Sequence, residues 1–303
     1  MKRNTAYLVL GVGVLFVSTS AIFVKLAAAP SGVTAFYRLF FTLLLLSPLV
    51  FCSRERRSEL FHLPARVVGA SLASGCFLAV HYILWFESLH YTSVSSSTVL
   101  VTLQPLFTIL FSWLFLKERQ NGIALTGCAV ALVGSFIIGF GDFKAGPEAV
   151  AGDLMAIAAA ALISAYFFIG QQVRREVSAS VYSVLGYFGS VVFLAVYVLI
   201  KGEAFTGYPA ATWGSLLGLA VFPTALGQFT FNMLLKWLPA TAISMSILGE
   251  PIGTSILAYF ILKETITLQQ TVGMVVILAG ITLYFRAEQL ALRLKGRRPE
   301  QTA

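Results

Sequence analysis

Long apolar runs separated by short polar segments dominate the chain. A transmembrane helix needs about 20 mostly apolar residues at a rise of 1.5 Å per residue. Ten such runs can be counted, at 5–26, 32–51, 65–90, 93–116, 121–140, 152–172, 179–200, 211–236, 239–262 and 268–286. Continuous runs must satisfy their backbone polar groups within the lipid, which predicts helices. A β-barrel would alternate in segments of about ten residues, and this chain does not. The pattern predicts an all-α polytopic membrane protein with ten transmembrane helices.

Charge is scarce and lies mainly between the apolar runs. Charged residues make up 11% of the chain, against roughly 25% in soluble domains, and hydrophobic residues make up 58%. This composition excludes a water-soluble protein. The net charge is +8, and most of the 21 lysines and arginines fall on one face of the membrane, whereas Lys144, Lys201 and Lys263 fall on the other. The positive-inside rule therefore predicts a multi-pass protein with both termini cytoplasmic.

The two halves of the chain repeat each other at a constant offset. Pro105 and Pro251 are 146 positions apart, and the same offset pairs the Leu-Lys-Glu segments at 116–118 and 262–264. Each repeat contains five predicted helices, so the second copy enters the membrane from the opposite side. Inverted repeats of this kind are typical of secondary transporters. The predicted organisation is a first repeat over 6–140, a second repeat over 152–286 and a basic cytoplasmic tail over 287–303.

Three segments carry a family resemblance. They are LHYTSVSSSTVLVTLQPLFTILFSWLFLKE in the first repeat, LKWLPATAISMSILGEPIGTSILAYFILKE in the second, and PSGVTAFYRLFFTLLLL, which contains Arg38. The chain resembles proteins with two EamA domains in the drug/metabolite transporter superfamily, and bacterial inner-membrane members in particular. The resemblance implies alternating access at a central cavity lined by helices 1, 3, 4, 6, 8 and 9. It also implies export of small organic metabolites such as amino acids, although members move many classes of solute.

Glu250 is the most informative polar residue within a span. Ionisable residues in a membrane span are costly and are commonly functional. Pro251 follows Glu250 and removes a backbone donor, which opens the helix beside the carboxylate. The repeat places Gln104 before Pro105 at the equivalent position. We expect Glu250 and Gln104 to contact substrate, with Glu250 as a site for a coupled proton. The alternative is a buried glutamate that only fixes helix packing.

Two further groups of polar residues are candidates for substrate binding. His81 and Trp85 are four residues apart and therefore share a helix face, with Tyr82 beside them. They could form an aromatic wall suited to organic substrates or cations. The repeat places Gln228 and Asn232 in the corresponding part of helix 8. The alternative is that the aromatic residues fill the core and the amides join neighbouring helices.

Arg38 and Glu87 are predicted to lie at similar depths near the outer ends of helices 2 and 3. Their opposite charges suggest an ion pair, which would be structural or would act as an outer gate. An arginine snorkelling outward is a further alternative for Arg38. Glycines seven residues apart in each repeat, which return to one helix face, predict close helix packing or a dimer surface: Gly127, Gly134, Gly273 and Gly280.

No sequence motif points to an enzyme. Metalloprotease, hydrolase and P-loop motifs are not found in the sequence, and the three cysteines have no metal-ligand spacing. We therefore expect no cofactor, no metal and no nucleic-acid partner. The expected partners are a small-molecule substrate, the lipid bilayer and protons, in a monomer or homodimer. The alternatives are an uncoupled facilitator or exchanger of metabolites and, from a different class, an integral-membrane enzyme or a lipid-handling protein.

Overall fold

A computed structural model describes residues 3–92, 94–117, 120–139, 146–263 and 266–296. All regular structure in these residues is helical, which confirms the predicted fold class. Nine helices of the described part are long and apolar enough to cross a membrane, and Gly122–Ile138 is a shorter apolar helix. Six spans are single helices: α3 (Ser31–Phe51), α5 (Ala65–Tyr91), α8 (Gly122–Gly139), α9 (Pro147–Val173), α10 (Ala179–Lys201) and α15 (Leu268–Gly296). A short helix, α4 (Arg54–Phe61), has no buried residue.

The other four spans are interrupted near their middles. They are α1 (Arg3–Val17) with α2 (Ser20–Ala27), α6 (Val94–Val101) with α7 (Gln104–Leu116), α13 (Ala240–Ile247) with α14 (Glu250–Leu262), and α11 (Ala210–Leu219) with the π-helix η1 (Ala220–Gln228) and α12 (Phe229–Leu234). Proline explains three of these interruptions, because Pro105, Pro251 and Pro223 lack the N–H that an α-helix needs. In the first span, the Ser18 and Thr19 hydroxyls bond to the carbonyls of Val14 and Phe16, which bends helices.

A neighbouring span, α9, is hydrogen-bonded to the backbone at the start of α7. The carbonyl of Gln104 accepts hydrogen bonds from the hydroxyls of Ser164, at 2.8 Å, and Thr108, at 2.9 Å. Backbone groups freed in a membrane span must find such partners, because hydrocarbon offers none. An irregular backbone is therefore stable in the middle of the bundle.

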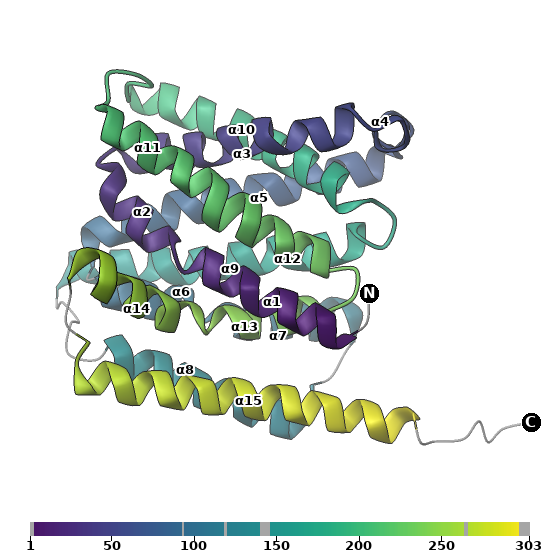
Figure 1. The fold of residues 1–303 in the computed structure, drawn as a ribbon, viewed down its shortest axis with the longest axis vertical. Helices are drawn as coiled ribbons and strands as arrows, with labels where there is room; N and C mark the ends of the chain where they lie inside the picture. Colours follow the sequence, from purple (N-terminus) through teal and green to yellow (C-terminus); the bar gives the residue numbers. More distant parts are fainter. Residues whose placement is uncertain (1–2, 93, 118–119, 140–145, 264–265, 297–303) are drawn as a thin grey trace, which may run out of the picture.

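Helices α8 and α15 lie side by side along one edge of the molecule (Figure 1). The predicted glycines are the reason they come so close. A Cβ atom on Gly280 would lie 2.3 Å from the backbone nitrogen of Ala131, and one on Gly134 would lie 2.7 Å from the carbonyl oxygen of Gly273. Of the two predicted roles for these glycines, the structure therefore shows close packing within the chain.

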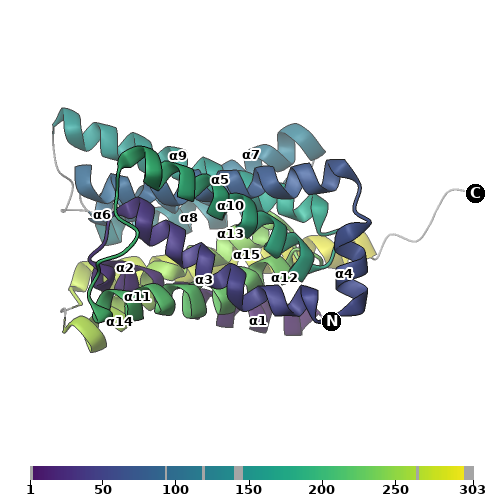
Figure 2. The same cartoon turned by 90° about the horizontal axis from the view of Figure 1, so that it is seen from above.

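The remaining helices form the main body of the bundle (Figure 1), and α4 lies at the same end of the bundle as the start of α1 (Figure 2). Its largest apolar core joins α3, α5, α9, α10 and α12, and Tyr166, Tyr182, Phe167 and Phe231 are fully buried there. Helix α15 extends to Gly296, past the predicted end of the last span. The end of the predicted basic tail, 297–303, lies outside the described residues.

Candidate substrate cavity

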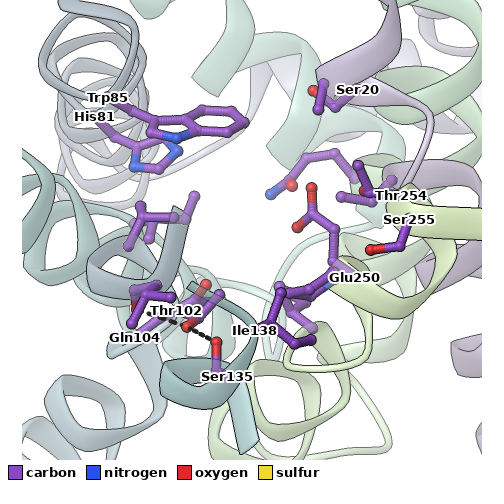
Figure 3. A pocket seen from close by; sticks show the side chains of 18 of the residues that line it. Ser20, His81, Trp85, Thr102, Gln104, Ser135, Ile138, Glu250, Thr254 and Ser255 are labelled. Carbon is purple, nitrogen blue, oxygen red and sulfur yellow. Dashed lines mark hydrogen bonds between the residues drawn. The ribbon is translucent and has the colours of Figure 1, made fainter. Parts of the chain in front are cut away.

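A cavity of about 250 Å³ lies among the interrupted spans. Residues of both repeats line it, because α2, α3, α5 and α6 contribute from the first repeat and α9, η1 and α14 from the second. Its size is below the roughly 300–1,000 Å³ of pockets for drug-sized ligands, so it suits a small molecule. Figure 3 shows the side chains around this space.

The aromatic wall predicted on α5 is present on one side of the cavity. The His81 and Trp85 rings are stacked with centroids 5.9 Å apart. His81 Nδ1 lies 2.9 Å from the carbonyl oxygen of Ala159. A carbonyl only accepts, so Nδ1 carries a proton, and Nε2 is left for another hydrogen bond. Trp85 Nε1 is buried and has no hydrogen-bond partner within the described chain.

Glu250 lies on the opposite side of the cavity. It is the first residue of α14, directly after the helix break, and Pro251 lines the cavity beside it. Figure 3 shows its carboxylate directed into the cavity, near Thr254 and Ser255 and facing His81 and Trp85. The break explains this placement, because it exposes the end of a helix at mid-span rather than at the membrane surface.

Arg38 also lines the cavity, and it is 2% exposed. Its Nε donates to Thr224 Oγ1 at 2.9 Å and its Nη1 donates to Ser20 Oγ at 2.8 Å. Its guanidinium carbon lies 4.4 Å from the centre of the Tyr82 ring, a cation–π contact. Among the described residues that line the cavity there is thus one permanent cation, Arg38, and one carboxyl group, Glu250.

Gln104 and Gln228 complete the set of predicted residues in the cavity wall. Gln104 Nε2 donates to Ser244 Oγ at 3.1 Å. Gln228 Nε2 is buried without a hydrogen-bond partner among the described residues. Pro105 is buried next to Gln104 but does not line the cavity. Pro105 therefore interrupts the helix beside Gln104, and its own side chain does not contact the cavity.

The structure does not bring Asn232 and Glu87 to the cavity. Asn232 is fully buried, and its Nδ2 donates to Tyr166 Oη at 2.6 Å and to Ser183 Oγ at 3.0 Å. The predicted pairing of Arg38 with Glu87 is not formed among the described residues: Arg38 donates to Thr224 and Ser20 in the cavity wall, where Glu87 does not lie. Glu87 instead lies near Glu203, in the loop after α10, where burial and then the Glu87 charge raise the pKa of the Glu203 carboxyl.

Sequence reasoning missed several hydroxyl groups of the wall, and Figure 3 shows four of them: Thr102, Ser135, Thr254 and Ser255. Thr102 and Ser135 are hydrogen-bonded to each other at 2.8 Å. One signal was available, since Thr254 follows Glu250 by four residues and must share its helix face. Ser135 gave no such signal, because only the packing of α8 brings it to the cavity.

The cavity extends toward one end of the bundle. Its lining reaches Ile138 at the end of α8, Ala258 in the second half of α14, and Ile266 and Gln270 where α15 begins. The described residues of the loops at the opposite end contribute nothing to the lining. The cavity mouth, defined here as Ile138, Ala258, Ile266 and Gln270, is thus at a single end.

Interrupted helices around a polar cavity at mid-span define a class of protein, the multi-pass membrane proteins built like transporters. The sequence profile of the EamA-like transporter family matches residues 4–140 and 150–286. The chain therefore belongs to this family, as the resemblance predicted, and it is a multi-pass membrane transporter by family. The match occurs once in each half of the chain.

Two relatives support the same assignment, and one solved structure shares the fold. An uncharacterized transporter of Archaeoglobus fulgidus is 27% identical, with 94% of this chain and 97% of the relative covered. The uncharacterized transporter YetK of Bacillus subtilis is 25% identical, with 92% of this chain and 86% of the relative covered. A crystal structure matches with a TM-score of 0.79 at 19% identity, covering 97% of this chain and 99% of that chain. At this identity the last match shows a shared fold alone.

Proposed function

We propose that this protein is a secondary active transporter that exports small organic metabolites such as amino acids across the inner membrane. Substrate binds in the cavity between the repeats, and Glu250 carries the coupled proton. The observation that carries the proposal is the placement of Arg38 and Glu250 in one small cavity with an aromatic wall. Separate groups there offer hydrogen-bond donors and acceptors, as a zwitterionic solute requires.

Alternating access follows from the inverted repeats and the single mouth. Two similar halves related by an axis in the membrane plane have two related arrangements, open to opposite sides. The predicted orientation, with both termini cytoplasmic, puts the mouth on the outer side. The structure then corresponds to an outward-open state, and export requires a second state in which the cavity opens to the cytoplasm.

Counterflow in proteoliposomes tests this function. Vesicles are loaded with unlabelled amino acids, and uptake of the same labelled solute is followed with and without a pH gradient. A transporter gives transient accumulation of an unchanged solute, whereas an enzyme gives a changed product without accumulation. Absence of counterflow for every solute in a panel of amino acids, sugars, nucleotides and cations would contradict the proposal.

Glu250→Gln tests the coupling. The variant keeps the shape of the side chain and loses the titratable group, so we expect counterflow to persist and the response to a pH gradient to be lost. The matched control is Glu148→Gln, at the exposed start of α9 and outside the cavity, and it should keep both activities. A pH response that survives in Glu250→Gln would favour uncoupled exchange or another proton carrier.

A further inference from the structure

Arg38 is a buried charge whose hydrogen bonds go to neutral groups. Among the described residues the ion pair that forms is Arg66 with Glu176, at 2.7 Å, and Arg38 takes part in none. Glu250 lines the same cavity but forms no ion pair with Arg38. Burying a charge without a counter-charge is unfavourable. The guanidinium therefore offers a strong site to an anion that enters the cavity.

The two hydroxyls that Arg38 holds belong to irregular segments. Ser20 is the first residue of α2, directly after the break in the first span, and Thr224 lies within the π-helix. Thr224 Oγ1 also donates to the carbonyl of Leu219, five residues back. Thr42, one turn from Arg38 on α3, bonds to the carbonyl of Ala220 at 3.1 Å. Helix α3 thus ties down two segments that have weakened internal hydrogen bonding.

The repeat provides an internal comparison. The offset of 146 places Tyr166, Leu78 and Val184 at the positions equivalent to Ser20, Thr224 and Arg38. All three equivalents lie in uninterrupted helices, α9, α5 and α10. The first span and the π-helix pack against each other, as do α9 and α5. The two irregular segments therefore carry the hydroxyls that bond to Arg38. The regular pair, α9 and α5, has Tyr166 and Leu78 at these positions, and Val184 stands in place of the arginine.

We propose that Arg38 binds the substrate carboxylate and thereby couples substrate binding to the movement of these helices, an inference that rests on the function proposed above. A carboxylate on the substrate takes the guanidinium N–H groups from Ser20 and Thr224. The Ser20 and Thr224 hydroxyls are then released from α3, which keeps only its Thr42–Ala220 bond to the π-helix, and the cavity mouth closes. A carboxylate carries a full negative charge and accepts two parallel N–H···O bonds from a guanidinium, so it competes well with two neutral hydroxyls. The planar fork of arginine suits a carboxylate in a way that lysine does not.

The test measures how open the cavity is from outside. Ser255, on the cavity wall, is replaced by cysteine in a Cys52→Ser, Cys76→Ser, Cys128→Ala background and labelled with a membrane-impermeant maleimide. The probes are the standard L-amino acids, each beside its amide, which lacks the carboxylate. The control is Leu268→Cys at the exposed start of α15, whose labelling should not change. Counterflow of each variant is measured in parallel.

We expect amino acids that give counterflow to slow labelling at Ser255→Cys, with an affinity about tenfold or more above that of their amides. Arg38→Lys should lose this preference. The double variant Ser20→Ala, Thr224→Val should label more slowly even without solute, because the open state has lost the two hydrogen bonds from Arg38 that stabilise it. Thr224→Ser keeps a hydroxyl and should behave as the parent protein.

Two outcomes would overturn the inference: amides that protect as well as the acids, or a double variant that labels at the parental rate. The comparison of acid and amide needs no change at Arg38, Ser20 or Thr224, so it holds even if the double variant does not fold. Failure of the proposed function is distinguishable, because the parent protein would then show no counterflow for any solute. If counterflow occurs but acids and amides slow the labelling equally, the role of Arg38 is contradicted and the proposed transport function is not.

Discussion

At the scale of single residues, two amides four positions apart have different surroundings. Gln228 lines the cavity, whereas Asn232 donates to Tyr166 and Ser183 inside the bundle. Sequence alone gave both the same expected role in substrate binding. The structure favours a packing role for Asn232, because both hydrogens of its amide are already used within the protein.

We expect Asn232→Leu to lower stability and to leave substrate affinity unchanged. It removes two buried hydrogen bonds, at a cost of about 1–2 kcal/mol in the free energy of unfolding. Thermal unfolding in detergent measures the first effect, and solute binding by the folded fraction measures the second. Gln228→Leu is the contrasting variant and should weaken binding. A weaker substrate affinity in Asn232→Leu at unchanged stability would contradict the packing role and indicate that Asn232 contacts substrate.

At the scale of elements, interruption and close packing have separate roles. The four interrupted spans surround the cavity and bring polar side chains and free helix ends to mid-span. The uninterrupted pair α8 and α15 packs through glycines along one edge. Association between helices in lipid depends on close van der Waals contact, because lipid removes the usual hydrophobic drive. Small residues therefore matter more here than apolar ones.

Gly280→Ala tests the packing of this pair. The added Cβ meets backbone atoms of Ala131 and Gly127, which cannot move aside as a flexible side chain would. We expect a loss of about 1–3 kcal/mol in stability, seen as a lower midpoint of thermal unfolding in detergent by tryptophan fluorescence. Gly69→Ala in α5 is the matched control, since its Cβ meets nothing within 4 Å, and helix propensity should make it neutral or slightly stabilising. Equal effects of the two variants would exclude a special role for the α8–α15 contact.

At the scale of the whole molecule, the direction of transport depends on orientation. The distribution of lysine and arginine predicts cytoplasmic termini, and the mouth then faces outward. Orientation is not a property of the helical bundle by itself, because the same fold could enter the membrane either way. An independent measurement therefore decides which side each loop occupies.

Native cysteine provides that measurement. Cys52 is exposed at the end of α3, and it should be cytoplasmic. In a Cys76→Ser, Cys128→Ala variant, a membrane-impermeant maleimide should label it in inside-out vesicles and not in intact cells. Ala210→Cys, at the exposed start of α11 and placed in a background without other cysteines, should show the reverse. The opposite pattern at both positions would invert the proposed direction of the mouth.

The sequence by itself determined the helical class, the spans, the repeat and the position of Glu250 beside a helix break. These features are local, since hydropathy and proline act through composition and backbone chemistry over one span. Only the tertiary structure decided which polar groups meet. Arg38 bonds to Ser20 and to Thr224, which is 186 residues away, and Glu87 lies apart from it. The rotation of each helix about its axis decides such partners, and that rotation is fixed by packing across the whole bundle.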